Sequence, residues 1–285
     1  MAADVHDHVF VTNSGDNTVS VIDAGTNTVT ATINVGLRPE SVATDPQFGV
    51  YVANGGIGTV SVIGRLNTVI ATLNVGGPPS VFDPPSRVVG MAVDHLLSRA
   101  YVTSRSHHRV ATIGISSDPP TVAHDFIDVQ GPLGVAVDSR NHRLYVTQPD
   151  FNTVSVIDAA THGVIATIPV RQHPTGIAVD ARSHRVYVAN SGFKTVSVID
   201  SVTGGAAEID VGVRPIGVAV DSRGDAYVTI SDGSVKVIDS RFNSVSATIP
   251  VGSQPEGVAF EPHSNRVYVA NRGDGTVSAI DLARG

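Results

Sequence analysis

The chain has 285 residues, of which 41% are hydrophobic and 16% are charged, so it is long enough to bury a sizeable core. Its formal net charge of −7 at pH 7 comes with no basic stripe, which disfavours nucleic acid and anionic membrane surfaces as partners. Cysteine is absent, which excludes disulfides, thiolate catalysis and cysteine-based zinc sites.

The beginning of the chain carries no targeting signal as it stands. Residues 1–7 include neither a basic stretch nor an apolar one. No apolar run elsewhere approaches the roughly 20 residues that a membrane span requires. A membrane span is therefore not expected. The compartment stays open, since the chain is either cytoplasmic as it stands or extracytoplasmic after removal of a leader.

A four-part unit repeats along the chain and is clearest at residues 132–170. Its parts read Gly-Val-Ala-Val-Asp, Leu-Tyr-Val-Thr, Thr-Val-Ser-Val-Ile-Asp and Val-Ile-Ala-Thr-Ile-Pro-Val, in that order. Each part is a short run rich in β-branched residues and bounded by Gly, Asn, Asp or Pro, and a helical period is absent. The unit therefore predicts four short strands. The aspartate that ends Val-Ile-Asp recurs in most repeats, and we expect it to fix turns through side-chain hydrogen bonds.

The second part of the unit recurs along the whole chain and gives the number of repeats. In chain order its aromatic residues are Phe10, Tyr51, Tyr101, Tyr145, Tyr187, Tyr227 and Tyr268. The intervals between them are 41, 50, 44, 42, 40 and 41 residues. Seven repeats of four strands predict an all-β fold, a seven-bladed β-propeller with four-stranded antiparallel blades, as a single domain over residues 1–285. A β-solenoid is the structural alternative, although its repeats are usually shorter.

The two ends of the repeat array are incomplete. Only four residues follow Asp281, so the last repeat has no outer strand, and Ala3-Asp4 provides at best a stub of the first inner strand. We expect a three-stranded last blade, or a chain trimmed from a longer protein. An open outer edge is also a candidate for pairing with another chain.

The repeated motifs carry a family resemblance. Tyr-Val-Ala-Asn at 187–190, Thr-Val-Ser-Val-Ile-Asp at 153–158 and Pro-x-Gly-Val-Ala-Val-Asp at 132–138 resemble the YVTN repeats of bacterial and archaeal β-propellers. The resemblance covers nearly the whole chain and implies the propeller fold. Its members include surface-layer-type proteins, exported propellers of uncertain role, and relatives of propeller lactonases and lyases. Since the recurring residues build blades, the resemblance leaves the function open.

Candidate site residues come from two loop families that should open on one face around the channel mouth. These are the connection from the fourth strand of one blade to the first strand of the next (the 4–1 loop) and the loop between the second and third strands (the 2–3 loop). In the 4–1 loops we expect catalytic acid–base roles for His173, Glu40 and Glu256, and ligand-binding roles for Arg38, Arg214 and Gln254. The alternative is that all six are ordinary polar residues of solvated turns.

The 2–3 loops add a second group of candidates. Residues 105–109 replace the usual Asn-x-Gly by two histidines and two arginines, which makes Arg105, His107 and His108 candidate ligand-binding residues. Gln148 comes from the following blade, and Phe82 from the proline-rich connection at 76–90. Adjacent histidines point in different directions on an extended chain, so a metal would need His107 or His108 together with His173 or a glutamate from another blade. No cofactor is evident, and a divalent metal stays open.

Two functions fit this sequence. The first is a ligand- or protein-binding module that acts through the channel-mouth face, since no nucleophile elbow, P-loop or HExxH motif is present. The alternative is an enzyme of the lyase, cyclase or lactonase type acting on a small carboxylate- or lactone-containing molecule. The partners expected are a small-molecule ligand or a protein. Nucleic acid is disfavoured by the acidic balance and the scarcity of exposed aromatic residues.

Overall fold

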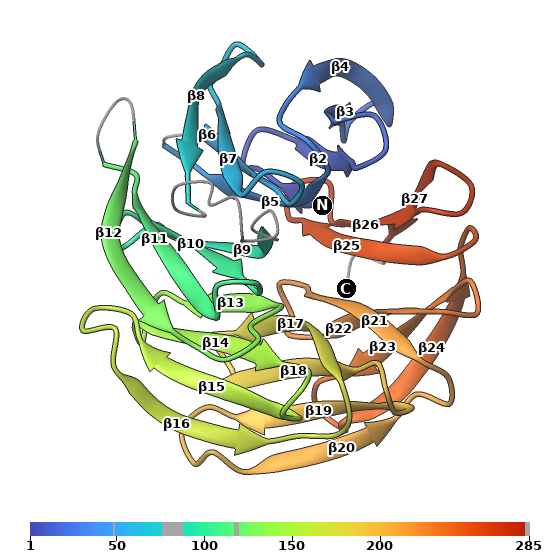
Figure 1. Ribbon diagram of the computed structural model, residues 1–285. Helices are drawn as coiled ribbons and strands as arrows, with labels where there is room; N and C mark the ends of the chain where they lie inside the picture. Colours follow the sequence, from blue (N-terminus) through green and yellow to red (C-terminus); the bar gives the residue numbers. More distant parts are fainter. Residues whose placement is uncertain (48, 76–87, 117–119, 283–285) are drawn as a thin grey trace.

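The computed structural model describes residues 1–47, 49–75, 88–116 and 120–282, which form strands β1 to β27 in seven antiparallel sheets. Six sheets have four strands and the last has three, which confirms the predicted all-β, seven-bladed propeller with an incomplete last blade. Figure 1 shows the blades following one another around a common centre, from blue to red, until blade 7 lies beside blade 1. The described residues contain no helix long and apolar enough to cross a membrane.

Each blade is built from strands that are consecutive in the chain. Blade 1 has β1 (Ala2–Ala3), β2 (His8–Asn13), β3 (Thr18–Asp23) and β4 (Thr28–Asn34); blade 2 has β5 (Pro39–Asp45), β6 (Gly49–Asn54), β7 (Thr59–Ile63) and β8 (Val69–Asn74); blade 3 has β9 (Val88–Asp94), β10 (Arg99–Ser104), β11 (Arg109–Gly114) and β12 (Thr121–Asp128); blade 4 has β13 (Val135–Asp138), β14 (Arg143–Gln148), β15 (Thr153–Asp158) and β16 (Val164–Pro169). Blade 5 has β17 (Pro174–Asp180), β18 (Arg185–Asn190), β19 (Thr195–Asp200) and β20 (Ala206–Asp210); blade 6 has β21 (Pro215–Val220), β22 (Ala226–Ile230), β23 (Ser234–Asp239) and β24 (Ser244–Pro250); blade 7 has β25 (Pro255–Glu261), β26 (Arg266–Asn271) and β27 (Thr276–Asp281).

The hydrophobic core is divided among the interfaces between neighbouring blades. Tyr145 of β14 is fully buried and packs in one cluster with Val156 and Ile168 of its own blade and with Val186 and Ile199 of blade 5. Equivalent clusters lie between the other blade pairs, so both faces of the second and third strands are apolar. Each blade therefore depends on its neighbours for the burial of its side chains.

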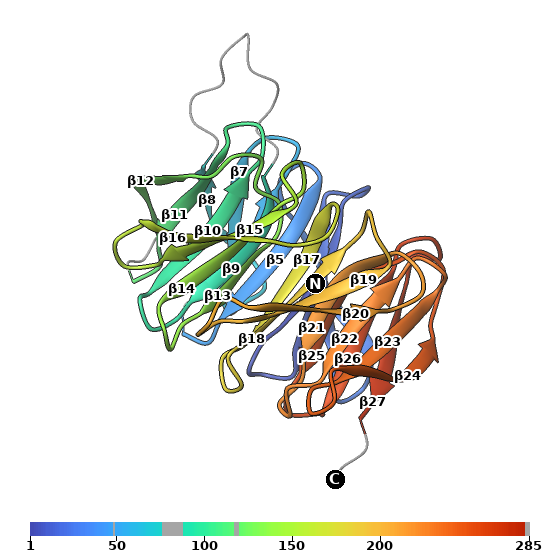
Figure 2. The same ribbon diagram turned by 90° about the horizontal axis from the view of Figure 1, so that it is seen from below.

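The first strands of successive blades converge at the centre of the molecule. They contact one another around the ring, β13 against β17, β17 against β21 and β21 against β25, and Figure 2 shows the molecule turned to view these strands from below. The amide of Gly134 donates to Thr147 Oγ1 at 2.8 Å, and the Thr147 hydroxyl donates to the carbonyl of Thr175 in the next blade at 3.1 Å. The glycine of the Pro-x-Gly motif and the threonine of Tyr-Val-Thr are thus used together to join two blades.

Blade 7 meets blade 1 without exchanging a strand. The short β1 pairs only with β2 in blade 1, as expected for a stub, and β27 ends blade 7. Contacts across the junction come from side chains: Arg266 Nη1 donates to the carbonyl of Ala24 at 2.7 Å, and the Tyr268 hydroxyl lies 3.0 Å from Asn27 Oδ1. Side-chain hydrogen bonds and packing therefore close the ring.

Candidate functional site

The 4–1 and 2–3 loops share one face, as the sequence predicts. The amide of Gly55 donates to the carbonyl of Arg38 at 2.9 Å, and the amide of Ser191 donates to that of His173 at 3.0 Å. Blades 6 and 7 repeat the contact, from Ser231 to Arg214 and from Arg272 to Gln254, each at 3.0 Å. In these four blades the 4–1 loop that enters the blade is therefore hydrogen-bonded to the 2–3 loop of the same blade.

Three of the candidate residues in the 4–1 loops have unusual backbone angles. The φ angles of Arg38, His173 and Gln254 are 50°, 55° and 49°, in the left-handed region that non-glycine residues rarely adopt. Two of these loops are fixed by an asparagine from the neighbouring 2–3 loop: Asn17 Oδ1 accepts the amide of Arg38 at 2.8 Å, and Asn152 Oδ1 accepts that of His173 at 2.9 Å. These two asparagines are not among the residues predicted from the sequence, although each directly precedes a Thr-Val-Ser-Val strand.

Blade 5 departs from this arrangement. Lys194 occupies the position of Asn17 and Asn152, directly before Thr195, and a lysine ammonium has no acceptor with which to fix the next loop. Instead, Asp210 Oδ1 accepts the amide of Gly212 at 2.7 Å. The 4–1 loop after blade 5 is therefore fixed by the last residue of β20, the strand that leads into it. Beside Lys194 the surface is hollowed.

This hollow, which we call the blade 5–6 pocket, has a volume of about 700 Å³. It is lined by residues 191–194 of the 2–3 loop of blade 5, by Thr195 at the start of β19, by Asp210 at the end of β20, and by Gly212, Val213 and Arg214 of the following 4–1 loop. Phe193 is 48% exposed and Val213 is 36% exposed. The pocket thus combines apolar surface with two cationic side chains, Lys194 and Arg214.

The charges around the pocket favour an anion. The single carboxylate in its wall, Asp210, already accepts a backbone hydrogen bond, and the guanidinium of Arg171 lies 5.8 Å from the centre of the Phe193 ring. Within the described residues, no ion pair engages Arg214 or Lys194. Both cations are therefore available to pair with a ligand carboxylate or phosphate.

His173 lies at the margin of this pocket. Its Nδ1 is 3.1 Å from the hydroxyl of Ser191, a pocket residue, and the same hydroxyl donates to the His173 carbonyl at 2.9 Å. The structure therefore places two of the predicted residues, His173 and Arg214, beside one hollow. Of the two glutamates, Glu40 lies in blade 2 and Glu256 in blade 7, where its carboxylate pairs with Arg272 at 2.9 Å.

The 105–109 loop uses its polar groups to join blade 3 to blade 4. Arg105 makes two hydrogen bonds to the Asp150 carboxylate, at 2.8 and 2.9 Å. His108 Nδ1 accepts the amide of Gly131 at 3.0 Å, the same contact that asparagine makes in blades 1 and 4, and His107 Nδ1 lies 3.1 Å from Ser104 Oγ. The two histidines thus bond in different directions.

The last two candidates come from different surroundings. Gln148 is 8% exposed, and its amide bonds to the carbonyl of Gln130 and to the hydroxyls of Thr153 and Ser155, at 2.9, 3.1 and 2.6 Å. It takes the position that asparagine has in the Tyr-Val-Ala-Asn blades. Phe82 lies outside the described residues.

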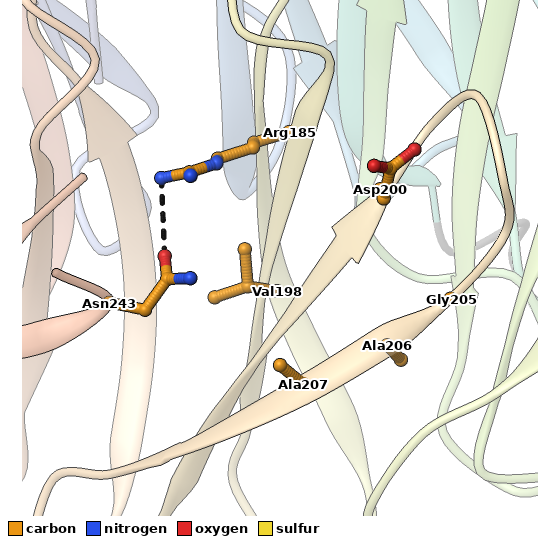
Figure 3. Close-up of a pocket in the computed structure, with 7 residues that line it drawn as sticks. All are labelled: Arg185, Val198, Asp200, Gly205, Ala206, Ala207 and Asn243. Atoms are coloured by element: carbon orange, nitrogen blue, oxygen red, sulfur yellow. Dashed lines mark hydrogen bonds between the residues drawn. The ribbon is translucent and has the colours of Figure 1, made fainter. Parts of the chain in front are cut away.

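Two further features lie away from the channel-mouth face. A smaller pocket of about 340 Å³ opens beside β20, where Ala206 pairs with Ile199 at a place that Val164 fills in blade 4. In Figure 3, Arg185 points across this pocket to Asn243, whose Oδ1 is 3.2 Å from Arg185 Nη1. The pocket is therefore open because Ala206 is smaller than the valine at this place in blade 4. Arg185 is already used in a contact that joins blade 5 to blade 6.

Asp7, Glu261 and His263 form a group with ligand atoms within 4.8 Å of one another. Burial disfavours the charged form of Glu261, but hydrogen bonds from Ser264 and His263 outweigh this effect and keep its pKa below the ordinary value. The amides of both residues donate to the Glu261 carboxylate, at 2.6 and 2.9 Å. Glu261 thus takes the turn-fixing role that aspartate has in other blades, for example Asp138.

Comparison with known proteins gives a short match in sequence and a full match in fold. No family profile matches the chain. A stretch of 43 residues, 15% of the chain, is 54% identical to the PE-PGRS family protein PE_PGRS18 of Mycobacterium tuberculosis and spans 9% of that protein's length.

The solved structures that match over 99% of the chain include proteins of different kinds. A hydrazine synthase structure from Kuenenia stuttgartiensis has a TM-score of 0.83 at 18% identity over 94% of that chain. A catalytically inactive virginiamycin B lyase from Staphylococcus aureus with quinupristin gives 0.81 at 15% over 93%. A chain of a mitotic checkpoint complex gives 0.84 at 15% over 89%. At these identities the likeness shows that this chain shares their β-propeller fold.

Proposed function

We propose that this chain is a ligand-binding propeller whose blade 5–6 pocket takes a small anionic molecule with an aromatic or apolar part. The observation that carries the proposal is a pocket of about 700 Å³ whose wall combines the exposed Phe193 with two cationic side chains, Lys194 and Arg214. Pockets for small molecules typically have volumes of about 300–1,000 Å³ and a few polar groups in an apolar wall. Stacking on the ring and pairing with the cations would bind the two parts of such a ligand.

A second candidate, an enzyme of the lyase, cyclase or lactonase type, is supported by the position of His173. Its ring lies beside Ser191 at the pocket margin, so it would serve as the general base while Arg214 holds the ligand carboxylate. A fold neighbour is a virginiamycin B lyase, which makes this chemistry compatible with the architecture. Glu40 and Glu256 lie in blades 2 and 7, away from the blade 5–6 pocket. These glutamates, or a divalent metal bound by them, would take part in the reaction only if the substrate extended from the pocket toward those blades.

A thermal-shift experiment with designed variants tests the binding proposal. The purified chain is screened with aromatic carboxylates and with their neutral amides. A ligand that binds the folded state raises the melting temperature by mass action, so the carboxylates should raise it and the amides should not. Arg214→Gln and Phe193→Ala should each weaken binding about tenfold. Arg272→Gln, an exposed arginine in blade 7, is the control and should bind as the original chain does.

Lys194→Asn is the most specific variant, because it introduces the side chain that fixes the loops after blades 1 and 4. It should abolish the shift without lowering the melting temperature of the ligand-free chain. A shift that is unchanged in all three pocket variants, or that the amides give equally, would contradict the proposal. Binding that survives in His173→Ala with loss of product formation, followed by mass spectrometry, would favour the enzyme.

A further inference from the structure

His173 is held by hydrogen bonds on both sides of its backbone. Its φ angle of 55° lies in the left-handed region, and its amide donates to Asn152 Oδ1 at 2.9 Å. Its carbonyl accepts the amide of Ser191 at 3.0 Å and the hydroxyl of the same serine at 2.9 Å. The backbone that carries the imidazole ring is therefore fixed to the 2–3 loops of blades 4 and 5.

The ring of His173 contacts the same serine. Its Nδ1 lies 3.1 Å from Ser191 Oγ, within hydrogen-bond distance. Ser191 is only 8% exposed, whereas His173 is exposed, so the hydroxyl is covered and the ring is open to solvent. In blade 6 the same amide-to-carbonyl bond joins Ser231 to Arg214. Of the four loops joined in this way, blade 5 is therefore the one that pairs an imidazole with a hydroxyl.

The two contacts of the Ser191 hydroxyl decide which ring nitrogen carries the proton. A hydroxyl has one proton and a carbonyl oxygen has none to give, so the proton of Ser191 lies toward the His173 carbonyl. The contact with Nδ1 is then a hydrogen bond only if Nδ1 donates its own proton to Oγ. The reverse arrangement would leave two oxygen atoms 2.9 Å apart with no proton between them. The neutral ring is therefore protonated on Nδ1.

This protonation leaves Nε2 as the basic atom of His173. In a neutral imidazole one nitrogen donates and the other accepts, so a proton on Nδ1 leaves a lone pair on Nε2. When Nε2 takes a proton, the ring becomes a cation, and its bond from Nδ1 to Ser191 strengthens because charged donors form the stronger hydrogen bonds. The serine hydroxyl donates onward to the carbonyl, so two hydrogen bonds in series stabilise the cation.

We propose that Ser191 is a positioning residue that holds His173 in the Nδ1–H form, so that Nε2 is the atom that receives a proton from the substrate. The role of base rests on the enzyme candidate described above, whereas the protonation of the ring does not. The Nε2 lone pair takes the proton of a C–H or O–H bond in the substrate or in water, and the electron pair of that bond stays on the carbon or oxygen. Arg214 and Lys194 in the adjacent pocket stabilise the negative charge that develops.

The same arrangement decides against a serine nucleophile at this site. A serine attacks after a base removes its proton, and the base must offer a lone pair to the hydroxyl. Nδ1 of His173 is protonated and offers none. A lactone would therefore be opened by water: Nε2 takes a proton from the water as its oxygen adds to the carbonyl, the ring C–O bond breaks, and the proton returns to the released oxygen. No ester of Ser191 would form.

Nitrogen NMR tests the protonation of the ring directly. The full chain is labelled with isotopic histidine, and proton–nitrogen correlation spectra of the rings are recorded at about pH 8. The signals of His173 are identified by their absence in His173→Gln. Nδ1 should have the chemical shift of a protonated ring nitrogen, and Nε2 that of an unprotonated one. Lowering the pH to about 5 should move the Nε2 signal far more than the Nδ1 signal, because the added proton binds Nε2.

Variants of the serine test its positioning role. Ser191→Ala removes the acceptor of the Nδ1 proton and should change the ratio of the two neutral forms about fivefold toward Nε2–H, the loss expected for one hydrogen bond. Ser191→Thr keeps a hydroxyl and should restore the original ratio. Ser231→Ala, at the same place in blade 6, is the matched control and should leave the His173 signals unchanged. Urea unfolding checks that the variants fold.

A fluorophosphonate, which esterifies activated serine hydroxyls, tests the absence of a nucleophile. The full chain is incubated with the reagent and digested, and the peptide that contains Ser191 is measured by mass spectrometry. No adduct is expected at Ser191. A serine protease treated in parallel should be labelled completely, which shows that the reagent is active.

Three results would overturn the proposal: a protonated Nε2 at about pH 8, an unchanged ratio of neutral forms in Ser191→Ala, or a fluorophosphonate adduct at Ser191. All three measurements use the ligand-free chain, so they are independent of the thermal shifts that test the proposed ligand. A protonated Nδ1 in a chain that gives no thermal shift would support the role of Ser191 and contradict the proposed ligand.

Discussion

At Gly134 the first strands of two neighbouring blades leave no room for a side chain. A Cβ atom built there would lie 2.4 Å from the carbonyl oxygen of Thr175, a backbone atom that cannot rotate away. The amide of the same glycine bonds to Thr147, whose hydroxyl bonds to that carbonyl. The glycine therefore permits both the close approach and the hydrogen bonds that join blade 4 to blade 5.

Gly134→Ala should separate the two strands and lower the free energy of unfolding by about 1–3 kcal/mol, the usual cost of overpacking. Urea unfolding followed by circular dichroism measures this loss. Gly15→Ala is the control, because no heavy atom lies within 4 Å of a Cβ built at Gly15 and the turn is exposed. Equal losses in the two variants would show that crowding between blades is not the cause.

Single residues show where inference from the sequence stops. The histidines at 107 and 108 stand out because they break a repeat, yet their ring nitrogens contact Ser104 and Gly131. Lys194 does not stand out in the sequence, although it replaces the asparagine that fixes the next loop in blades 1 and 4. A repeat alignment shows which residue differs, whereas the contact that a residue makes depends on a neighbouring blade.

The turns between third and fourth strands are fixed by the aspartate that ends Val-Ile-Asp, as the sequence predicts. Asp158 Oδ1 accepts the amide of Thr161 at 2.7 Å, and Asp200 Oδ1 accepts that of Thr203 at 2.9 Å. In Asp200 the hydrogen bonds from the amides of Thr203 and Val202 hold the pKa below its ordinary value of 3.8. A hydrogen-bonded turn of this kind is local, so its role could be predicted from the repeat alone.

This arrangement gives stability a defined dependence on pH. Because the pKa of Asp200 is lower in the folded than in the unfolded chain, its contribution is present above about pH 4 and is lost as the pH falls further. Asp23 and Asp158 act in the same direction, and Arg241 lowers the pKa of Asp239 to about 2. The free energy of unfolding should therefore decrease between about pH 4 and pH 2.

Asp200→Asn isolates the contribution of one turn, because the amide oxygen still accepts hydrogen bonds but does not titrate. Urea unfolding at about pH 5 and at about pH 2.5 should show a smaller loss of stability for Asp200→Asn than for the original chain. Parallel losses would mean that the pKa of Asp200 in the folded chain is not lowered.

For the whole molecule, the number of blades and the three-stranded last blade could be predicted because each repeat carries its own strands and pairs them locally. The closure of the ring could not be predicted in the same way. Arg266 and Ala24 are separated by 242 residues, and nothing in a repeat unit indicates that the last arginine of this type meets the first blade. The corresponding arginine of blade 3, Arg99, donates to the Ala159 carbonyl of the following blade at 2.9 Å.

The two arginines make similar bonds, but removing them should have different consequences. Blades 3 and 4 stay connected by the chain when Arg99 is lost, whereas among the described residues no strand is shared between blade 7 and blade 1. Arg266→Ala should therefore allow the ring to open at this junction. Hydrogen exchange measured by mass spectrometry should be about tenfold faster in β2 and in β25–β27, with the opposite blades unchanged.

Arg99→Ala is the matched control and should not produce a zone of fast exchange confined to the two blades that it joins. Asp281→Asn is a second control, because Arg266 also pairs with Asp281 inside blade 7 and that contact does not cross the junction. Uniform protection in Arg266→Ala would show that packing of Tyr268 against Val9, Val11 and Ile22 holds the ring closed without the arginine. The weakest boundary of this propeller is expected where the chain itself does not connect neighbouring blades.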